Sequence, residues 1–92
     1  MSGEKPKHPL SVERYSGSLE ELAKDIKDLR YDKVSELLGY LVEEFKGEAD
    51  KDLADRKTRL ASKLYQASEY LADAREEIDS AWKISKPYMK EE

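Results

Sequence analysis

A series of apolar residues at alternating steps of three and four positions constrains this chain more than any other feature of its sequence. Its members are Leu53, Leu60, Leu64, Ala67, Leu71, Ala74, Ile78 and Ala81. Only Lys57 interrupts the series. This heptad spacing is typical of a helix that packs lengthwise against a neighbour, and the small alanines let that neighbour approach closely. It predicts one long helix over residues 50–85, ended by Pro87 and packed in a hairpin.

The residues before this helix predict a short first helix. Ser18 and Glu21 stand at the spacing of a capping box, in which a hydroxyl and a carboxylate satisfy the free amides of a helix start. We therefore expect a helix from Leu19. The apolar periodicity then slips by one residue, which predicts a break over residues 30–32 with Asp32 as the cap of the next helix.

A second helix is expected over residues 33–46. Gly47 weakens a helix and Asp50 can cap one, so this pair predicts a turn over residues 47–50. Helix that continues to Lys51 or Asp52 is the alternative.

Together these elements predict an all-α, kinked helical hairpin, in which the first and second helices lie antiparallel to the long third helix. At 1.5 Å per residue the first two helices span roughly 42 Å and the third about 50 Å. A three-helix bundle with a bent third helix is the alternative. Pro6 and Pro9 prevent helix near the start. We expect residues 1–17 to form an extended N-terminal arm, 18–86 the helical domain and 87–92 a C-terminal tail.

Composition narrows the chemistry that this chain can perform. It has 92 residues, of which 38% are hydrophobic and 41% charged, so the core of its single domain will be thin. Cysteine is absent, and His8 is the one histidine. Disulfides, thiolate sites and pairs of histidine ligands are thereby excluded within one chain. We expect a protein that is not an enzyme and has neither a cofactor nor a metal site.

Charge and hydropathy bear on partners and location. The net charge is −4, and the acidic excess lies in residues 18–52. A nucleic-acid binder normally carries a dense basic stripe, which this chain lacks. No apolar run approaches the roughly 20 residues of a membrane span, and the start of the chain does not resemble a signal peptide. The prediction is a soluble, cytoplasmic protein that contacts no membrane.

The second helix is apolar over about half its circumference, which one partner helix cannot cover. Its large apolar residues are Val34, Leu37, Leu38, Leu41, Val42 and Phe45. This excess predicts a self-association surface that includes Leu37 and Val42, with Tyr40 beside them. A homodimer is the simplest assembly that would cover it.

A charge pattern on the long helix predicts a second self-association surface. Basic residues precede acidic ones, in the order Arg56, Arg59, Lys63, Glu69, Asp73 and Glu76. Two such helices that meet antiparallel about Gln66 would pair each basic residue with an acidic one, as a two-fold contact requires. The alternative is a solvated face on which this symmetry arises by chance.

The end of the long helix carries the candidate ligand site. Trp82 lies there with Lys83 and Lys86, and an aromatic ring beside cations can hold an anionic, nucleotide-like molecule. If the first helix runs antiparallel to the third, the arm brings Arg14 and Tyr15 to the same end, with His8 as a further member. The structural alternative is that Trp82 only caps the open end of the hairpin.

The sequence therefore supports three alternative predictions of function. The leading prediction is a non-enzymatic interaction or regulatory protein that acts as a homo-oligomer, with a further protein partner as an adaptor would have. The second is a protein that binds or sequesters a small anionic ligand. In length and layout the chain resembles small phage and bacterial helical-hairpin proteins that sequester nucleotide signals, although no motif carries the resemblance. The third is a nucleic-acid-associated regulator whose basic face is assembled across an oligomer.

Overall fold

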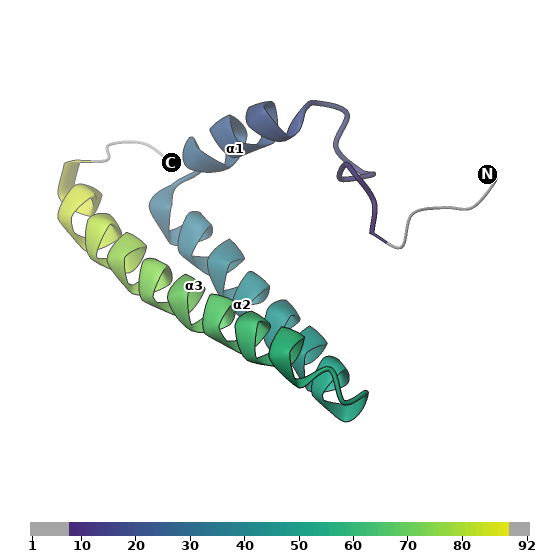
Figure 1. Ribbon diagram of the computed structural model, residues 1–92. Coiled ribbons are helices and arrows are strands. Elements are labelled where there is room, and N and C mark those ends of the chain that lie inside the picture. Colours follow the sequence, from purple (N-terminus) through teal and green to yellow (C-terminus); the bar gives the residue numbers. More distant parts are fainter. Residues whose placement is uncertain (1–7, 89–92) are drawn as a thin grey trace.

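The computed structural model describes residues 8–88 and contains three α-helices. They are α1 (Leu19–Lys27), α2 (Tyr31–Ala54) and α3 (Thr58–Ser85), followed by a single 3-10 turn, η1 (Lys86–Tyr88). Residues 8–88 contain no strand, so the all-α prediction is confirmed. Helices α2 and α3 pack side by side as an antiparallel hairpin (Figure 1). The first seven residues of the predicted arm and residues 89–92 of the predicted tail lie outside the described part of the chain.

The capping box forms at the start of α1. The Glu21 amide donates to the Ser18 hydroxyl over 3.1 Å, and the Ser18 amide donates to the Glu21 carboxylate over 2.8 Å. Two of the free amides of the helix start are satisfied in this reciprocal way. The prediction that this helix begins at Leu19 is confirmed.

The break between α1 and α2 falls at residues 28–30, close to the predicted slip, but its cap differs from the prediction. Arg30 is the N-cap of α2 and makes no side-chain capping bond. Asp32 lies inside the first turn, where its two carboxylate oxygens accept from the Arg30 guanidinium over 2.7 and 3.0 Å. The helix already includes Asp32 and its N-cap is Arg30, so the prediction of Asp32 as the cap is wrong.

The predicted turn over residues 47–50 is also wrong, because α2 continues through Gly47 to Ala54. One glycine inside a helix costs only about 1 kcal/mol relative to alanine, which a long packed helix tolerates. The reversal occurs instead at Asp55–Lys57, where Arg56 adopts a φ of 65°. The Lys57 amide closes this turn by donating to the Asp52 carbonyl over 2.8 Å. The third helix consequently begins at Thr58 and not near residue 50, while its predicted end at Ser85 is confirmed.

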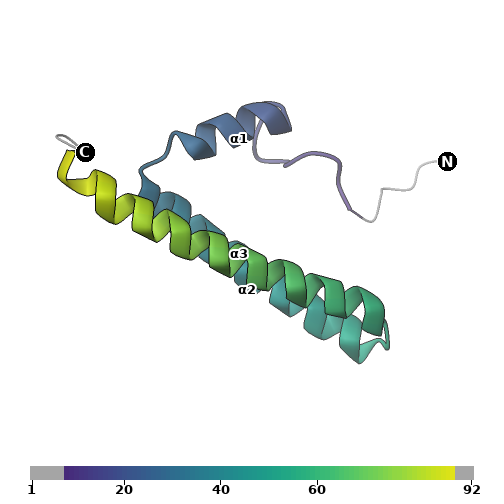
Figure 2. The same cartoon turned by 60° about the vertical axis from the view of Figure 1, so that its left-hand side comes forward.

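Helix α1 does not extend α2 in a line. In both views α1 runs toward the open end of the hairpin, the chain reverses there into α2, and α1 stands apart from the hairpin over most of its length (Figures 1 and 2). The kinked arm expected from the first two helices is therefore not formed, and neither is a compact three-helix bundle. The arm that precedes α1 continues toward the turn end of the hairpin.

The contact between α2 and α3 is made by small side chains. The most buried are Ser35 and Ala49 on α2, and Ala61 and Ser68 on α3. Ala61 and Ser68 each follow a residue of the predicted heptad seam, so the seam lies beside the contact and not within it. Large apolar residues flank the contact as a result, and no large side chain among the described residues is fully buried.

Candidate functional site

The most extensive candidate site is one apolar side of the α2–α3 hairpin, which we call the apolar face. It comprises Val34, Leu37, Leu41 and Phe45 from α2 and Leu60, Leu64, Leu71 and Ile78 from α3. Within each helix these residues are spaced by three, four or seven, which places them on one side. Two cavities are each lined by residues of both helices. Val34 and Ile78 line one cavity, and Phe45, Leu60 and Leu64 line the other.

The two cavities mark opposite ends of the apolar face. The cavity at the open end of the hairpin has a volume of about 370 Å³ and is roofed by Ala23, Ile26 and Lys27 of α1. The cavity at the turn end has a volume of about 330 Å³ and is lined by Glu48 and Asp52 as well as by apolar residues. Helix α1 therefore stands over the open end only, while His8 of the arm lines the cavity at the turn end.

Solvent exposure on this face is high for such large side chains. Phe45 is 38% exposed and Leu60 is 48% exposed, while Leu37, Leu41, Leu64, Leu71 and Ile78 are half-buried. Contiguous exposed apolar surface of this kind marks binding sites in soluble proteins.

The predicted self-association residues of α2 divide between this face and its margins. Leu37 belongs to the apolar face, and Val42 is half-buried beside it. Tyr40 is 62% exposed, and its hydroxyl donates to the Glu36 carboxylate over 3.2 Å. That bond and the neighbouring Lys33 hold the pKa of Glu36 below its ordinary value, with Lys33 as the larger cause. Of the large apolar residues predicted on this helix, Phe45 is exposed, Leu37, Leu38, Leu41 and Val42 are half-buried, and Val34 is buried.

Five of the six residues of the predicted charge pattern lie on α3. Arg59, Lys63, Glu69, Asp73 and Glu76 are exposed residues of α3. Arg56 instead lies in the turn at a positive φ, because α3 begins two residues later. The predicted pair between Arg56 and Glu76 of a second antiparallel helix would therefore join a residue of the turn to a residue of a helix.

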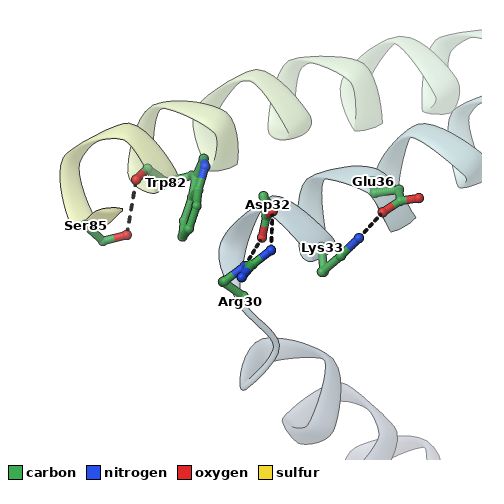
Figure 3. A network of polar contacts seen from close by, with 6 residues as sticks. All are labelled: Arg30, Asp32, Lys33, Glu36, Trp82 and Ser85. Atoms are coloured by element: carbon green, nitrogen blue, oxygen red, sulfur yellow. Dashed lines mark hydrogen bonds and ion pairs between the residues drawn. The ribbon is translucent and has the colours of Figure 1, made fainter. Parts of the chain in front are cut away.

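Trp82 closes the open end of the hairpin together with Arg30. The Arg30 guanidinium carbon lies 5.4 Å from the centre of the indole ring, and the same guanidinium holds Asp32 (Figure 3). A guanidinium over an indole face is attracted by the ring electrons. Asp32 next to this cation has its pKa held below the ordinary value, chiefly by the hydrogen bond from Arg30. Arg30 is absent from the predicted site, although an arginine two residues before an aspartate at a helix start indicates an ion pair.

The predicted ligand site is not assembled. Trp82, Lys83 and Lys86 lie at the open end, whereas Tyr15 bonds to Asp25 of α1 and His8 lines the cavity at the turn end. In both overall views the arm, which carries Arg14, is far from the end of α3 (Figures 1 and 2). The cause is the reversal at residues 28–30, since the prediction assumed that α1 continues in line with α2.

Two tyrosines fix other parts of the chain. The Tyr15 hydroxyl donates to Asp25 and ties the arm to α1, and the Tyr65 hydroxyl donates to Asp50 and ties α3 to α2. Each hydrogen bond favours the protonated phenol beside a carboxylate, so the pKa of Tyr15 and the pKa of Tyr65 are both raised. Arg75 adds a third tie by donating to the Ser35 hydroxyl over 3.1 Å.

Comparisons of the chain with protein-family models, curated proteins and solved structures gave no match. Within residues 8–88 no helix combines the length and the apolar character that a membrane crossing requires. The same residues contain no group of three or more histidine or carboxylate side chains placed to hold a metal ion.

Proposed function

We propose that this protein is a non-enzymatic helical interaction protein that acts as a homo-oligomer, most simply a homodimer, through its apolar face. The observation that carries the proposal is that Phe45 and Leu60 are exposed on this face, while its other large side chains, Leu37, Leu41, Leu64, Leu71 and Ile78, are only half-buried. A second copy supplies an identical face, and two such faces can cover each other about a two-fold axis.

The shape of the molecule supports the same proposal. The backbone extents are 51 × 30 × 15 Å, so the molecule is elongated and flat. A layer this thin cannot shield apolar residues on both of its sides. Packing of two layers through their apolar faces would give a four-helix arrangement with an interior.

Charge at the two ends of the apolar face favours a second copy over an unrelated partner. Lys27, which forms an ion pair with Asp28, lines the cavity at the open end, and Glu48, Asp52 and Lys57 line the cavity at the turn end. A two-fold axis through the middle of the face exchanges these ends. Lys27 of each copy would then approach the two carboxylates of the other.

The proposal predicts that polar substitutions on the apolar face dissociate the oligomer. Leu37→Gln combined with Leu60→Gln should shift the protein to the monomer mass in size-exclusion chromatography with light scattering. Ile84→Gln is the matched control, because Ile84 is an apolar residue of α3 that is 71% exposed outside the face.

Circular dichroism of each variant checks that the helices persist. Dissociation by the Leu37/Leu60 pair with no effect of Ile84→Gln supports the proposed surface. An oligomer that withstands the pair, or that Ile84→Gln disrupts equally, contradicts it.

A further inference from the structure

Asp52, in the last turn of α2, is a buried carboxylate with an unsatisfied oxygen. The residue is 6% exposed, and its Oδ2 atom is buried without a hydrogen-bond partner. The ion pairs formed among the described residues involve Lys27, Arg30, Lys33 and Lys51, and none of them reaches Asp52. Buried carboxylates in proteins are normally paired or hydrogen-bonded, so this one is suited to a cation from elsewhere.

The cavity beside Asp52 has the shape and lining for a cation on an apolar stem. It has a volume of about 330 Å³ and lies between the last turns of α2 and the first turns of α3. Its lining residues are His8, Phe45, Glu48, Asp52, Lys57, Leu60 and Leu64. Phe45, Leu60 and Leu64 offer apolar walls, and Glu48 adds a second negative charge. The methylene chain of a lysine-like group can pack on such apolar side chains while its ammonium end contacts a carboxylate.

We propose that this cavity binds a primary ammonium group on an aliphatic stem, with Asp52 as the acceptor and Phe45, Leu60 and Leu64 around the stem. One unsatisfied oxygen suits the compact charge of an ammonium group better than a guanidinium, whose planar fork needs two parallel acceptors. Glu48 and Asp52 outnumber the one lysine in the lining, Lys57, which disfavours an anionic ligand.

Two sources can supply this group. A free alkylamine would enter the cavity of a single chain, and this case does not depend on self-association. A lysine of a second copy, for which Lys27 is the candidate, would enter it in the homodimer, and this case rests on the proposed function. Lys57 and His8 line the same cavity, and capture of Asp52 by either of them is the outcome that leaves no room for a ligand.

The test is a titration of the full chain, labelled with nitrogen-15, with n-butylammonium chloride at constant ionic strength and neutral pH. Amide resonances of residues that line the cavity should shift in a saturable way, and n-butanol should not reproduce the shifts. Asp52→Asn should weaken the affinity at least tenfold while preserving the side-chain shape. Asp55→Asn is the control, because Asp55 is an exposed carboxylate next to the same turn.

Self-association of the same variants, measured over a dilution series, distinguishes a free alkylamine from a lysine of a second copy. If a second copy supplies the ammonium group, Asp52→Asn and Lys27→Met weaken self-association alike, and butylammonium competes with it. If the ligand is a free amine, Asp52→Asn leaves self-association unchanged but weakens the butylammonium titration that the unmodified chain shows. Binding that Asp52→Asn does not alter overturns the inference. So does an absence of both effects, which is the result expected if Lys57 or His8 fills the cavity.

Discussion

Gly39 and Gly47 occupy the same helix but have different surroundings. A side chain at Gly47 would meet no atom within 4 Å, whereas at Gly39 it would come within 2.6 Å of the Arg75 guanidinium. Gly47→Ala should therefore raise the free energy of unfolding by about 0.5–1 kcal/mol, because alanine loses less backbone freedom on folding.

Gly39→Ala should stabilise the protein less, since the new methyl group displaces Arg75 from Ser35. Urea unfolding of both variants measures the difference. Equal stabilisation at the two positions would show that Arg75 contributes nothing at this contact.

The phenols of Tyr15 and Tyr65 connect residue chemistry to pH. The pKa of each is raised by a hydrogen bond to a carboxylate, so the stabilising bond is fully present below the unfolded pKa of about 10. It is lost as the pH rises through the higher folded pKa. Tyr15→Phe should remove a late-ionising phenol from an absorbance titration at alkaline pH.

Asp25→Asn is the control for this titration, because it should return the Tyr15 pKa toward its ordinary value. If Tyr15→Phe removes absorbance from the early part of the curve instead, the arm is not bound to α1 through this hydrogen bond.

At the scale of helices and turns, the hairpin turn depends on Arg56. Its φ of 65° is a left-handed conformation that costs a non-glycine residue roughly 1–2 kcal/mol. Arg56→Gly should therefore stabilise the protein by about 1 kcal/mol, measured by urea unfolding. Arg56→Val should destabilise it, since a branched side chain resists this conformation further. An unchanged stability in both variants would mean that the turn forms differently.

The same turn shows what the sequence could and could not predict about the elements. The capping box at Ser18 and the stop before Pro87 rest on local chemistry, and both predictions are confirmed. The turn was predicted at Gly47 and occurs at Arg56, because packing along a long helix outweighs the weak helix preference of one glycine. No local signal marks an arginine for a left-handed position.

The heptad seam illustrates a similar limit. Its spacing correctly predicts that α3 packs along a neighbour, but the contact is centred one position away, on Ala61 and Ser68. Small residues allow the closest approach of two helices, while the larger Leu60 is displaced to the side. Periodicity defines a stripe on a helix, and the partner decides which part of the stripe is buried.

At the scale of the molecule, the reversal of α1 decides which sites can exist. It carries the arm to the turn end of the hairpin and separates Tyr15 from Trp82, so the predicted ligand site is divided. A break in periodicity locates the end of a helix but carries no information about the direction of the next one. The wide apolar circumference of α2 depends on side-chain chemistry alone, and it could be read from the sequence.

Self-association through the apolar face is the central claim about the whole molecule. Sedimentation equilibrium of the full chain, from low-micromolar to near-millimolar concentration, tests it most directly. We predict a mass that rises with concentration to about 21 kDa, twice the 10.6 kDa of one chain. A folded protein that stays at 10.6 kDa throughout this range would contradict the claim.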